Sequence, residues 1–145
     1  MEGPSSPGPD AASSFRHEMP PRADGITALV DELEAFAEGI GLAPRAAGRL
    51  VVVVEELAAN VAMHAAGASY LRVSARHEGG ALRLVLEDDG PAFDPLSADA
   101  PDLDAALEER EVGGLGVHFA RTMTRDLSYR RDGDVNRLTA TLDAA

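Results

Sequence analysis

The stretch that decides the fold is residues 50–64, which read LVVVVEELAANVAMH. Its four consecutive valines would suit a strand, but the residues that follow them are helix formers with no turn signal. Pro44 suits the first turn of a helix, and the segment from Pro44 to Gly67 is about 20 residues, which is too long for one strand. The sequence therefore predicts a helix over residues 44–65.

On either side of this helix, the periodicity of the apolar residues predicts the other elements. Helical spacing predicts further helices over 24–38 and 116–123, and residues 90–112 predict a long loop, functional or disordered. Alternation predicts an edge strand and two hairpins, with strands over 15–19, 70–77, 81–87, 127–131 and 137–142. Strands that pair mostly with their sequence neighbours predict an α+β fold. We expect a two-layer sandwich, with a mixed, mostly antiparallel sheet and about three helices on one face.

The length and composition of the chain exclude several classes of protein. The chain of 145 residues suits one domain over 15–145, preceded by a disordered tail over 1–14 that is rich in Pro, Gly, Ser and Ala. A net charge of −12 opposes direct binding to nucleic acid or anionic membranes, and polar residues interrupt the longest apolar stretch. The sequence has neither cysteine nor lysine, which excludes a disulfide, a thiolate nucleophile and a lysine-dependent P-loop. The expected location is the cytoplasm.

Three short motifs carry the candidate chemistry. Glu56 and Asn60 stand four residues apart on the 44–65 helix, so a carboxylate and a carboxamide project side by side toward a shared Mg²⁺-bound phosphate. Asp88 precedes Gly90 by two residues, so it can accept a hydrogen bond from a base while the glycine lets the base approach the backbone. Residues 113–116, Gly-Gly-Leu-Gly, feed a helix whose bare N–H groups suit a phosphate.

Each motif alone also has a simpler interpretation. A stripe such as Glu56, Asn60 and His64 is most often a solvated helix face, and His64 alone fits a packed helix residue equally well. An Asp-Asp-Gly sequence after a strand is most often a turn, and a Gly-rich run is most often a boundary between loop and helix. The order of the three motifs, with a long loop between the second and third, favours one pocket beneath a lid.

With these motifs in this order, the chain resembles the GHKL, or Bergerat-fold, ATPase superfamily over residues 15–145. The Glu-x-x-x-Asn, Asp-x-Gly and Gly-Leu-Gly motifs of that superfamily are matched here by residues 56–60, 88–90 and 114–116. The continuation over 90–95, Gly-Pro-Ala-Phe-Asp-Pro, is similar to the branch of small serine kinases that act as anti-sigma factors. The closing Asn136-Arg137-Leu138 also fits this resemblance.

The resemblance implies a role for each residue near the nucleotide. Asn60 would coordinate the Mg²⁺ that bridges the ATP phosphates, and Glu56 would be the general base toward a serine hydroxyl of a partner protein. Asp88 would accept a hydrogen bond from the adenine amino group, with Gly90 giving the base room. His64, where the family often has a histidine, would lie at the same cofactor site.

The resemblance also implies how the phosphates are held. Gly114, Leu115 and Gly116 would present the N–H groups of a helix to the phosphates, where the helix dipole favours negative charge. Because the chain has no lysine, any cationic side chain that contacts the phosphates must come from Arg110 or Arg121.

The leading hypothesis is therefore an ATP-dependent serine protein kinase that also acts as an anti-sigma factor in a partner-switching circuit. It would phosphorylate an anti-anti-sigma (STAS-type) protein, sequester a sigma factor and form a homodimer. Two alternatives stay open: a module that binds nucleotide and sequesters a partner without phosphoryl transfer, and an α+β interaction domain that binds no nucleotide. A base at Glu56 favours chemistry, since a binding module does not need one there.

Overall fold

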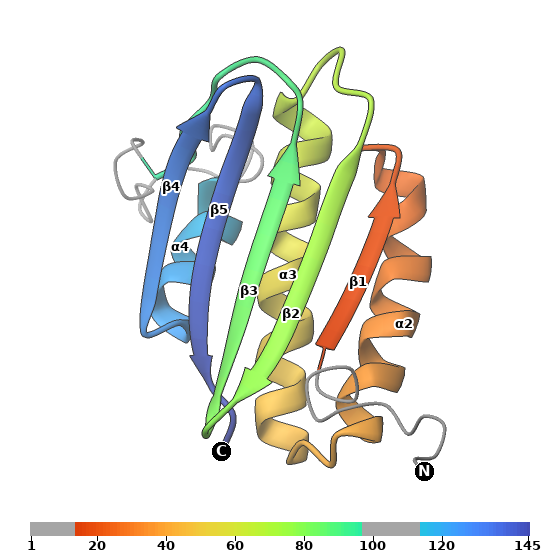
Figure 1. Cartoon of the computed structure of the whole chain (residues 1–145), viewed down its shortest axis with the longest axis vertical. Helices are drawn as coiled ribbons and strands as arrows, with labels where there is room; N and C mark the ends of the chain where they lie inside the picture. Colours follow the sequence, from red (N-terminus) through yellow and green to blue (C-terminus); the bar gives the residue numbers. More distant parts are fainter. Residues whose placement is uncertain (1–13, 97–113) are drawn as a thin grey trace, which may run out of the picture.

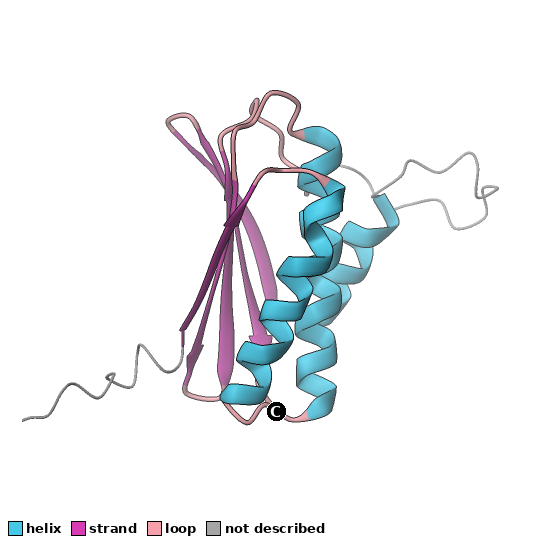
Figure 2. Cartoon of the chain, turned by 90° about the vertical axis from the view of Figure 1, so that its right-hand side faces the viewer, coloured by secondary structure: helices cyan, strands magenta, loops and turns pink. Residues whose placement is uncertain are grey.

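The computed structural model describes residues 14–96 and 114–145, which form a layer of strands and a layer of helices (Figure 1, Figure 2). The described strands are β1 (Ser14–Met19), β2 (Leu71–Glu78), β3 (Ala81–Asp88), β4 (Asp126–Asp132) and β5 (Val135–Asp143). They lie in the order β1-β2-β3-β5-β4. Three described α-helices, α2 (Ile26–Gly39), α3 (Pro44–His64) and α4 (Gly114–Met123), cover one face of this sheet, as the side view shows (Figure 2).

This architecture confirms the predicted α+β two-layer sandwich with its helices on one face. The prediction of a mixed sheet needs a correction, because every described pairing is antiparallel. The reason is that β4 and β5 form a hairpin in which β5 returns between β3 and β4, so that it runs against both neighbours. Ser14, which the sequence assigned to the tail, opens β1. The rest of that tail, most of the predicted loop and Arg110 lie outside the described residues.

Helix α3 is the longest described element and packs against both α2 and α4. It begins at Pro44, where the missing N–H of proline leaves no hydrogen bond unmade, and it ends at His64, one residue before the predicted end. The valines that would suit a strand instead supply part of the buried helical stripe, since Val53, Val54 and Leu57 have no exposed surface. Burial of this apolar stripe stabilises the helix more than the preference of the valines for a strand destabilises it.

Other predicted elements shift only at their ends. The first predicted helix divides into a 3₁₀ turn, η1 (Ala23–Gly25), and α2, while α4 begins two residues before its predicted start. Terminal turns lack the full set of helical hydrogen bonds, so sequence patterns define them poorly. Among the described residues, no helix combines the length and the apolar character needed to cross a membrane.

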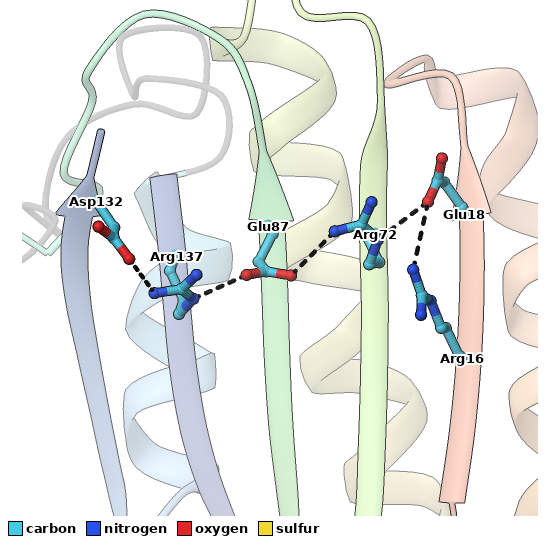
Figure 3. Close-up of polar contacts among 6 residues, drawn as sticks. All are labelled: Arg16, Glu18, Arg72, Glu87, Asp132 and Arg137. Carbon is cyan, nitrogen blue, oxygen red and sulfur yellow. Dashed lines mark hydrogen bonds and ion pairs between the residues drawn. The ribbon is translucent and has the colours of Figure 1, made fainter. Parts of the chain in front are cut away.

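The sheet has one apolar face and one charged face. The leucines of β3 are buried beneath the helices, whereas the opposite face carries a row of alternating charges across the strands (Figure 3). We call this row the open-face ladder, and its members are successive register partners: Glu18, Arg72, Glu87 and Arg137. Arg72 Nε lies 3.0 Å from the Glu18 carboxylate, and Arg137 Nε lies 2.8 Å from Glu87. Arg137 also reaches Asp132 at 3.1 Å.

The sheet also positions two polar residues on its covered face. Asp88 is the last residue of β3, and its register partner on β5 is Asn136. Successive side chains of a strand point to opposite faces, so these two lie on the helix side of the sheet while their neighbours Glu87 and Arg137 lie on the open face. The end of β3 and the start of β5 thereby bring a carboxylate and a carboxamide together near α3.

Candidate functional site

A pocket lies where the end of β3 and the start of β5 face the C-terminal half of α3. Helix α3 contributes Asn60 and His64, and the sheet contributes Asp88 and Asn136. The remaining lining residues are Val61, Ala65, Leu86, Pro91, Phe93, Pro95, Tyr129 and Leu138. The cavity is about 20 Å³, which holds one water molecule and is far smaller than ordinary ligand pockets. Its outer lining includes Pro91, Phe93 and Pro95, and we call the segment over 91–95 the closing segment.

Asn60 is a buried residue whose side-chain polar groups have no partner within the described part of the chain. It is 4% exposed, lines the pocket, and makes no hydrogen bond with any other described residue. A buried carboxamide that is not hydrogen-bonded costs about 1–3 kcal/mol, and such groups are rare in folded proteins. An orphaned side chain in a pocket is therefore evidence for a ligand that supplies the missing partner.

The two carboxylate oxygens of Asp88 differ in their hydrogen bonds: one accepts two, and the other accepts none from the described residues. Its Oδ1 accepts hydrogen bonds from the backbone N–H of Gly90 at 2.9 Å and from Asn136 Nδ2 at 3.0 Å. Its Oδ2 has no hydrogen-bond partner among the described residues, although the side chain is only 6% exposed. Oδ2 can thus accept a hydrogen bond from a ligand, while the hydrogen bonds to Oδ1 hold the carboxylate in place.

Asn136 connects Asp88 to the segment that closes the pocket. Besides Asp88, its Nδ2 donates to the carbonyl of Pro91 at 2.9 Å. Its Oδ1 accepts from the backbone N–H of Phe93 at 3.3 Å and from the Tyr129 hydroxyl. Sequence reasoning gave this residue no role. One signal in the sequence could have indicated it: Asn136 stands two residues before Leu138 and so lies on the same, buried face of β5.

Gly90 packs tightly against the end of α3. A Cβ added to Gly90 would lie 3.0 Å from the Cβ of Ala65 and 3.1 Å from Asp88 Oδ1, so these neighbours would have to shift by a few tenths of an ångström to admit a side chain. The carbonyl of Gly90 also accepts a hydrogen bond from Arg131 Nη1 at 2.8 Å. The glycine therefore allows the chain to turn closely around the Asp88 carboxylate.

Asp89, the next residue, supports the rim of the pocket. Its carboxylate accepts hydrogen bonds from the hydroxyl of Ser69 and from the backbone N–H groups of Ser69 at 2.7 Å and Tyr70 at 3.2 Å. These bonds, led by that of the Ser69 hydroxyl, lower the pKa of Asp89 below its ordinary value. Asp89 thereby fixes the connection between α3 and β2.

His64 forms the outer wall of the pocket together with Phe93. The two rings stack with their centroids 4.4 Å apart and an interplanar angle of 19°. Phe93 is 38% exposed, so the stacked pair stands at the mouth of the pocket, where the closing segment meets α3. His64 is thus a wall residue of the site.

Glu56 lies on the same stripe of α3 as Asn60 but is not among the residues that line the pocket. It is half-buried, and its carboxylate makes no hydrogen bond or ion pair with the described residues. It stands one helical turn before Asn60 along α3. The structure therefore leaves the Glu56 carboxylate unengaged beside the pocket.

Gly114, Leu115 and Gly116 form the first turn of α4. The first N–H groups of a helix have no partner within it, so this turn keeps the capacity to bind an anion. Arg121, farther along α4, donates a hydrogen bond to the carbonyl of Leu96 and so ties this helix to the chain that follows the closing segment.

A model of the family described as the histidine kinase-like ATPase domain matches residues 19–142. The chain belongs to the histidine kinase-like ATPase family. This family lies within the GHKL superfamily, so the predicted superfamily is confirmed. Membership implies ATP as the ligand.

Individual relatives agree with this assignment. The chain is 30% identical over 117 residues to the serine/threonine-protein kinase BtrW of Bordetella bronchiseptica, covering 76% of this chain and 82% of that protein. It superposes on the RsbU and RsbW domains of Rv1364c from Mycobacterium tuberculosis with a TM-score of 0.66 at 13% identity, over 90% of this chain and 32% of that one. The blue-light activated histidine kinase EL346 of Erythrobacter litoralis gives 0.51 at 20% identity, over 71% and 32% of the two chains. These two structures share the fold, and this chain spans about a third of each.

Proposed function

We propose that this chain is an ATP-dependent serine protein kinase that acts as an anti-sigma factor. The observation that supports its nucleotide site best is a pair of buried groups in one pocket, Asn60 and Asp88 Oδ2, which have no partner among residues 14–96 and 114–145. Phosphoryl transfer to a hydroxyl is supported by the similarity to a Bordetella protein that is named a serine/threonine-protein kinase.

The base end of the nucleotide would lie against Asp88. Its unpartnered Oδ2 is an acceptor, and the exocyclic amino group of adenine is the matching donor. Gly90 has no side chain that would compete for the space next to this carboxylate. His64 would form the outer wall of the base site.

The phosphate end would lie near Asn60 and the first turn of α4. The side-chain oxygen of Asn60 suits Mg²⁺, which keeps several waters and binds proteins through few ligands together with substrate phosphates. The described residues contain no cluster of three or more metal-binding side chains, which fits a metal held mainly by the nucleotide. Mg²⁺, when bound, neutralises charge on the transferred phosphoryl group. The N–H groups of Gly114, Leu115 and Gly116 would bind the phosphates.

Glu56 would act as the general base. It projects from the same helical stripe as Asn60, one turn away, so it would face the terminal phosphate from the side on which a partner approaches. Its carboxylate makes no protein contact among the described residues, which leaves it available to accept the proton of a serine hydroxyl. In this proposal the serine oxygen would bond to the γ-phosphorus while its proton passes to Glu56. The bond between the γ-phosphorus and the β,γ-bridging oxygen would break, and ADP would leave with that oxygen.

The partners would be those of a switching circuit in the cytoplasm. The chain would phosphorylate an anti-anti-sigma protein of the STAS type, sequester a sigma factor in the absence of that protein, and form a homodimer. The acidic surface implied by the net charge of −12 suits basic regions of a protein partner rather than nucleic acid.

The first experiment tests binding. A fluorescent ATP analogue is titrated into the purified chain with and without Mg²⁺, alongside Asn60→Ala. We expect Mg²⁺-dependent binding in the wild type and its loss in a variant that is still folded by circular dichroism. Binding that is identical in the two proteins would remove Asn60 from the site, and no binding by the folded wild type would refute the nucleotide function.

A second experiment tests transfer and has a matched control in the neighbouring residue. Glu56→Gln and Glu55→Gln each remove one charge from α3, but Glu55 is exposed and lies about 100° around the helix from Glu56. With labelled ATP and a STAS-type protein as acceptor, we expect Glu56→Gln to slow transfer by about 10²–10⁴-fold without weakening ATP binding, and Glu55→Gln to leave transfer unchanged.

One observation favours a second candidate function. Because Glu56 does not line the described pocket, the chain could bind nucleotide and sequester a partner without transferring phosphate. This candidate predicts ATP binding that depends on Asn60, no labelled acceptor in the wild type, and no effect of Glu56→Gln. The transfer experiment therefore separates the two functions.

A further inference from the structure

We propose that Asn136 is a positioning residue that fixes the Asp88 carboxylate and thereby makes the pocket select a purine with an amino group at position 6. This inference rests on the proposed nucleotide function and adds a residue to its recognition machinery. Its basis is a buried hydrogen-bond network that joins β5, the end of β3 and the closing segment of the pocket.

The surroundings of Asn136 determine the orientation of its carboxamide. The groups that face its Nδ2 are all acceptors: Asp88 Oδ1 at 3.0 Å, the carbonyl of Pro91 at 2.9 Å and the carbonyl of Gly90 at 3.4 Å. The groups that face its Oδ1 are the N–H of Phe93, which can only donate, and the hydroxyl of Tyr129, which donates here. A rotated amide would place its oxygen against the three acceptors and its NH2 group against the Phe93 N–H, so only the observed orientation satisfies these groups.

This orientation assigns separate tasks to the two oxygens of Asp88. Asn136 and the N–H of Gly90 both donate to Oδ1, which holds the carboxylate plane from two directions. The remaining Oδ2 has no partner within the described residues and belongs to a residue that lines the pocket. A carboxylate held in this way can accept a hydrogen bond from an amino group at position 6 of a purine. A purine with a carbonyl at that position would bring a second acceptor against the carboxylate, and no hydrogen bond would form.

Tyr129 explains why Asn136 stays in place. Its hydroxyl donates to Asn136 Oδ1 from β4, across the hairpin that joins β4 to β5. Asn136 is itself only 6% exposed, so its rotamer is restricted by the packing of the sheet. Residues from three strands would therefore determine which base is selected: Asp88, Tyr129 and Asn136. Of these three, only Asp88 would touch the nucleotide.

The experiment compares two ligands that differ only at the recognised position. Affinities for ATP and for purine riboside triphosphate, which has hydrogen in place of the 6-amino group, are measured by calorimetry on the full chain. We expect the wild type to favour ATP by about tenfold or more, since the hydrogen bond is made to a charged group. In Asn136→Ala the Asp88 carboxylate can turn away, and we expect this ratio to fall to about one.

The ratio separates positioning from a merely structural role. Leu142→Ala, which removes a buried side chain from the same strand far from the pocket, is the matched control, and we expect it to keep the wild-type ratio. If Asn136→Ala does not fold, Asn136→Ser is read in the same way. If the Asn136 variant loses the same factor of affinity for both ligands, the ratio is unchanged. That result would overturn the inference and leave the proposed function intact. A folded wild type that binds neither ligand would overturn both.

Discussion

Two neighbouring register pairs on β3 and β5 use opposite faces of the same sheet. Glu87 and Arg137 form an ion pair in the open-face ladder, with side chains that are 16% and 31% exposed (Figure 3). One step along the same strands, Asp88 and Asn136 are each 6% exposed beneath the helices. Both pairs join a carboxylate to a nitrogen donor at about the same distance. They differ in their access to water and in the charge of the donor, which is a guanidinium in the first pair and a neutral amide in the second.

The difference shows how burial turns a polar contact into a recognition element. In the open-face ladder, water competes for every charge, so each ion pair stabilises the fold by only about 0–1 kcal/mol. In the buried pair, water does not compete, so each donor and acceptor depends on a protein or ligand partner. Asp88 Oδ2 has no such partner among the described residues, and in our proposal the ligand supplies it. We therefore expect substitutions in the buried pair to affect both stability and binding, and those in the ladder to affect neither strongly.

The largest expected effect comes from a second carboxylate beside Asp88. Asn136→Asp replaces a donor that faces three oxygen atoms with an acceptor, and we expect the free energy of unfolding to fall by about 3–5 kcal/mol at neutral pH. Repulsion raises the pKa of the introduced carboxyl in the folded state, so the loss shrinks as the pH falls and that carboxyl is protonated. Urea denaturation across the acidic range measures both effects.

The matched substitution on the open face is Arg137→Glu, which puts a carboxylate beside Glu87 at the neighbouring register step. Because water reaches this pair, we expect a loss of about 1 kcal/mol that decreases in high salt. Equal losses in the two variants would show that the faces do not differ as described.

A smaller effect is expected from Tyr129→Phe, which removes the hydroxyl donor to Asn136 and leaves the ring in place. We expect a loss of about 1 kcal/mol in unfolding free energy, because one acceptor of a buried carboxamide loses a partner. We also expect a weaker preference for ATP over its analogue without the amino group. A variant as stable as the wild type, with the same preference, would remove Tyr129 from the network.

Asp89 gives a pH-dependent test of the pocket rim. Its pKa is lowered in the folded state, chiefly by the Ser69 hydroxyl, so its contribution to stability is present above its ordinary value of 3.8 and is lost as the pH falls through the lowered pKa. The stability difference between the wild type and Asp89→Ala should therefore be larger near neutral pH than at about pH 3. Urea midpoints that differ equally at both pH values would contradict this role.

The smallest effect is expected from Glu87→Gln, which removes the central carboxylate of the open-face ladder. Arg72 and Arg137 both reach this carboxylate, yet the variant should lose less than about 1 kcal/mol, and less still in high salt. Urea denaturation at low and high salt provides the measurement. A loss of several kcal/mol that does not depend on salt would place the ladder among the main supports of the fold.

Much of the fold could be predicted from local patterns. Alternation along β2 and β3 predicted these strands, and the length of the apolar stretch after Pro44 predicted α3 despite its valines. What the patterns could not supply were the ends of helices, where hydrogen bonding is incomplete, and the pairing of β3 with β5. That pairing depends on how a distant hairpin returns to the sheet.

The site could be predicted only in part for the same physical reason. Asn60, His64 and Asp88 carry motif signals, and the structure brings them to one pocket, whereas Glu56 is not among the described residues that line it. The role of Asn136 arises from contacts with residues more than 40 positions away, which no local pattern records. Its one local signal is a polar side chain on the inward phase of a strand.

The most direct test of the account compares ATP binding after two substitutions at neighbouring positions of β3. Asp88→Asn and Glu87→Gln each replace a carboxylate by a carboxamide, on the covered and the open face respectively. In calorimetric titrations with ATP and Mg²⁺, we expect Asp88→Asn to weaken binding by at least about tenfold and Glu87→Gln to change it by less than about twofold. Equal effects of the two substitutions, or no binding of ATP by the folded wild type, would contradict the account.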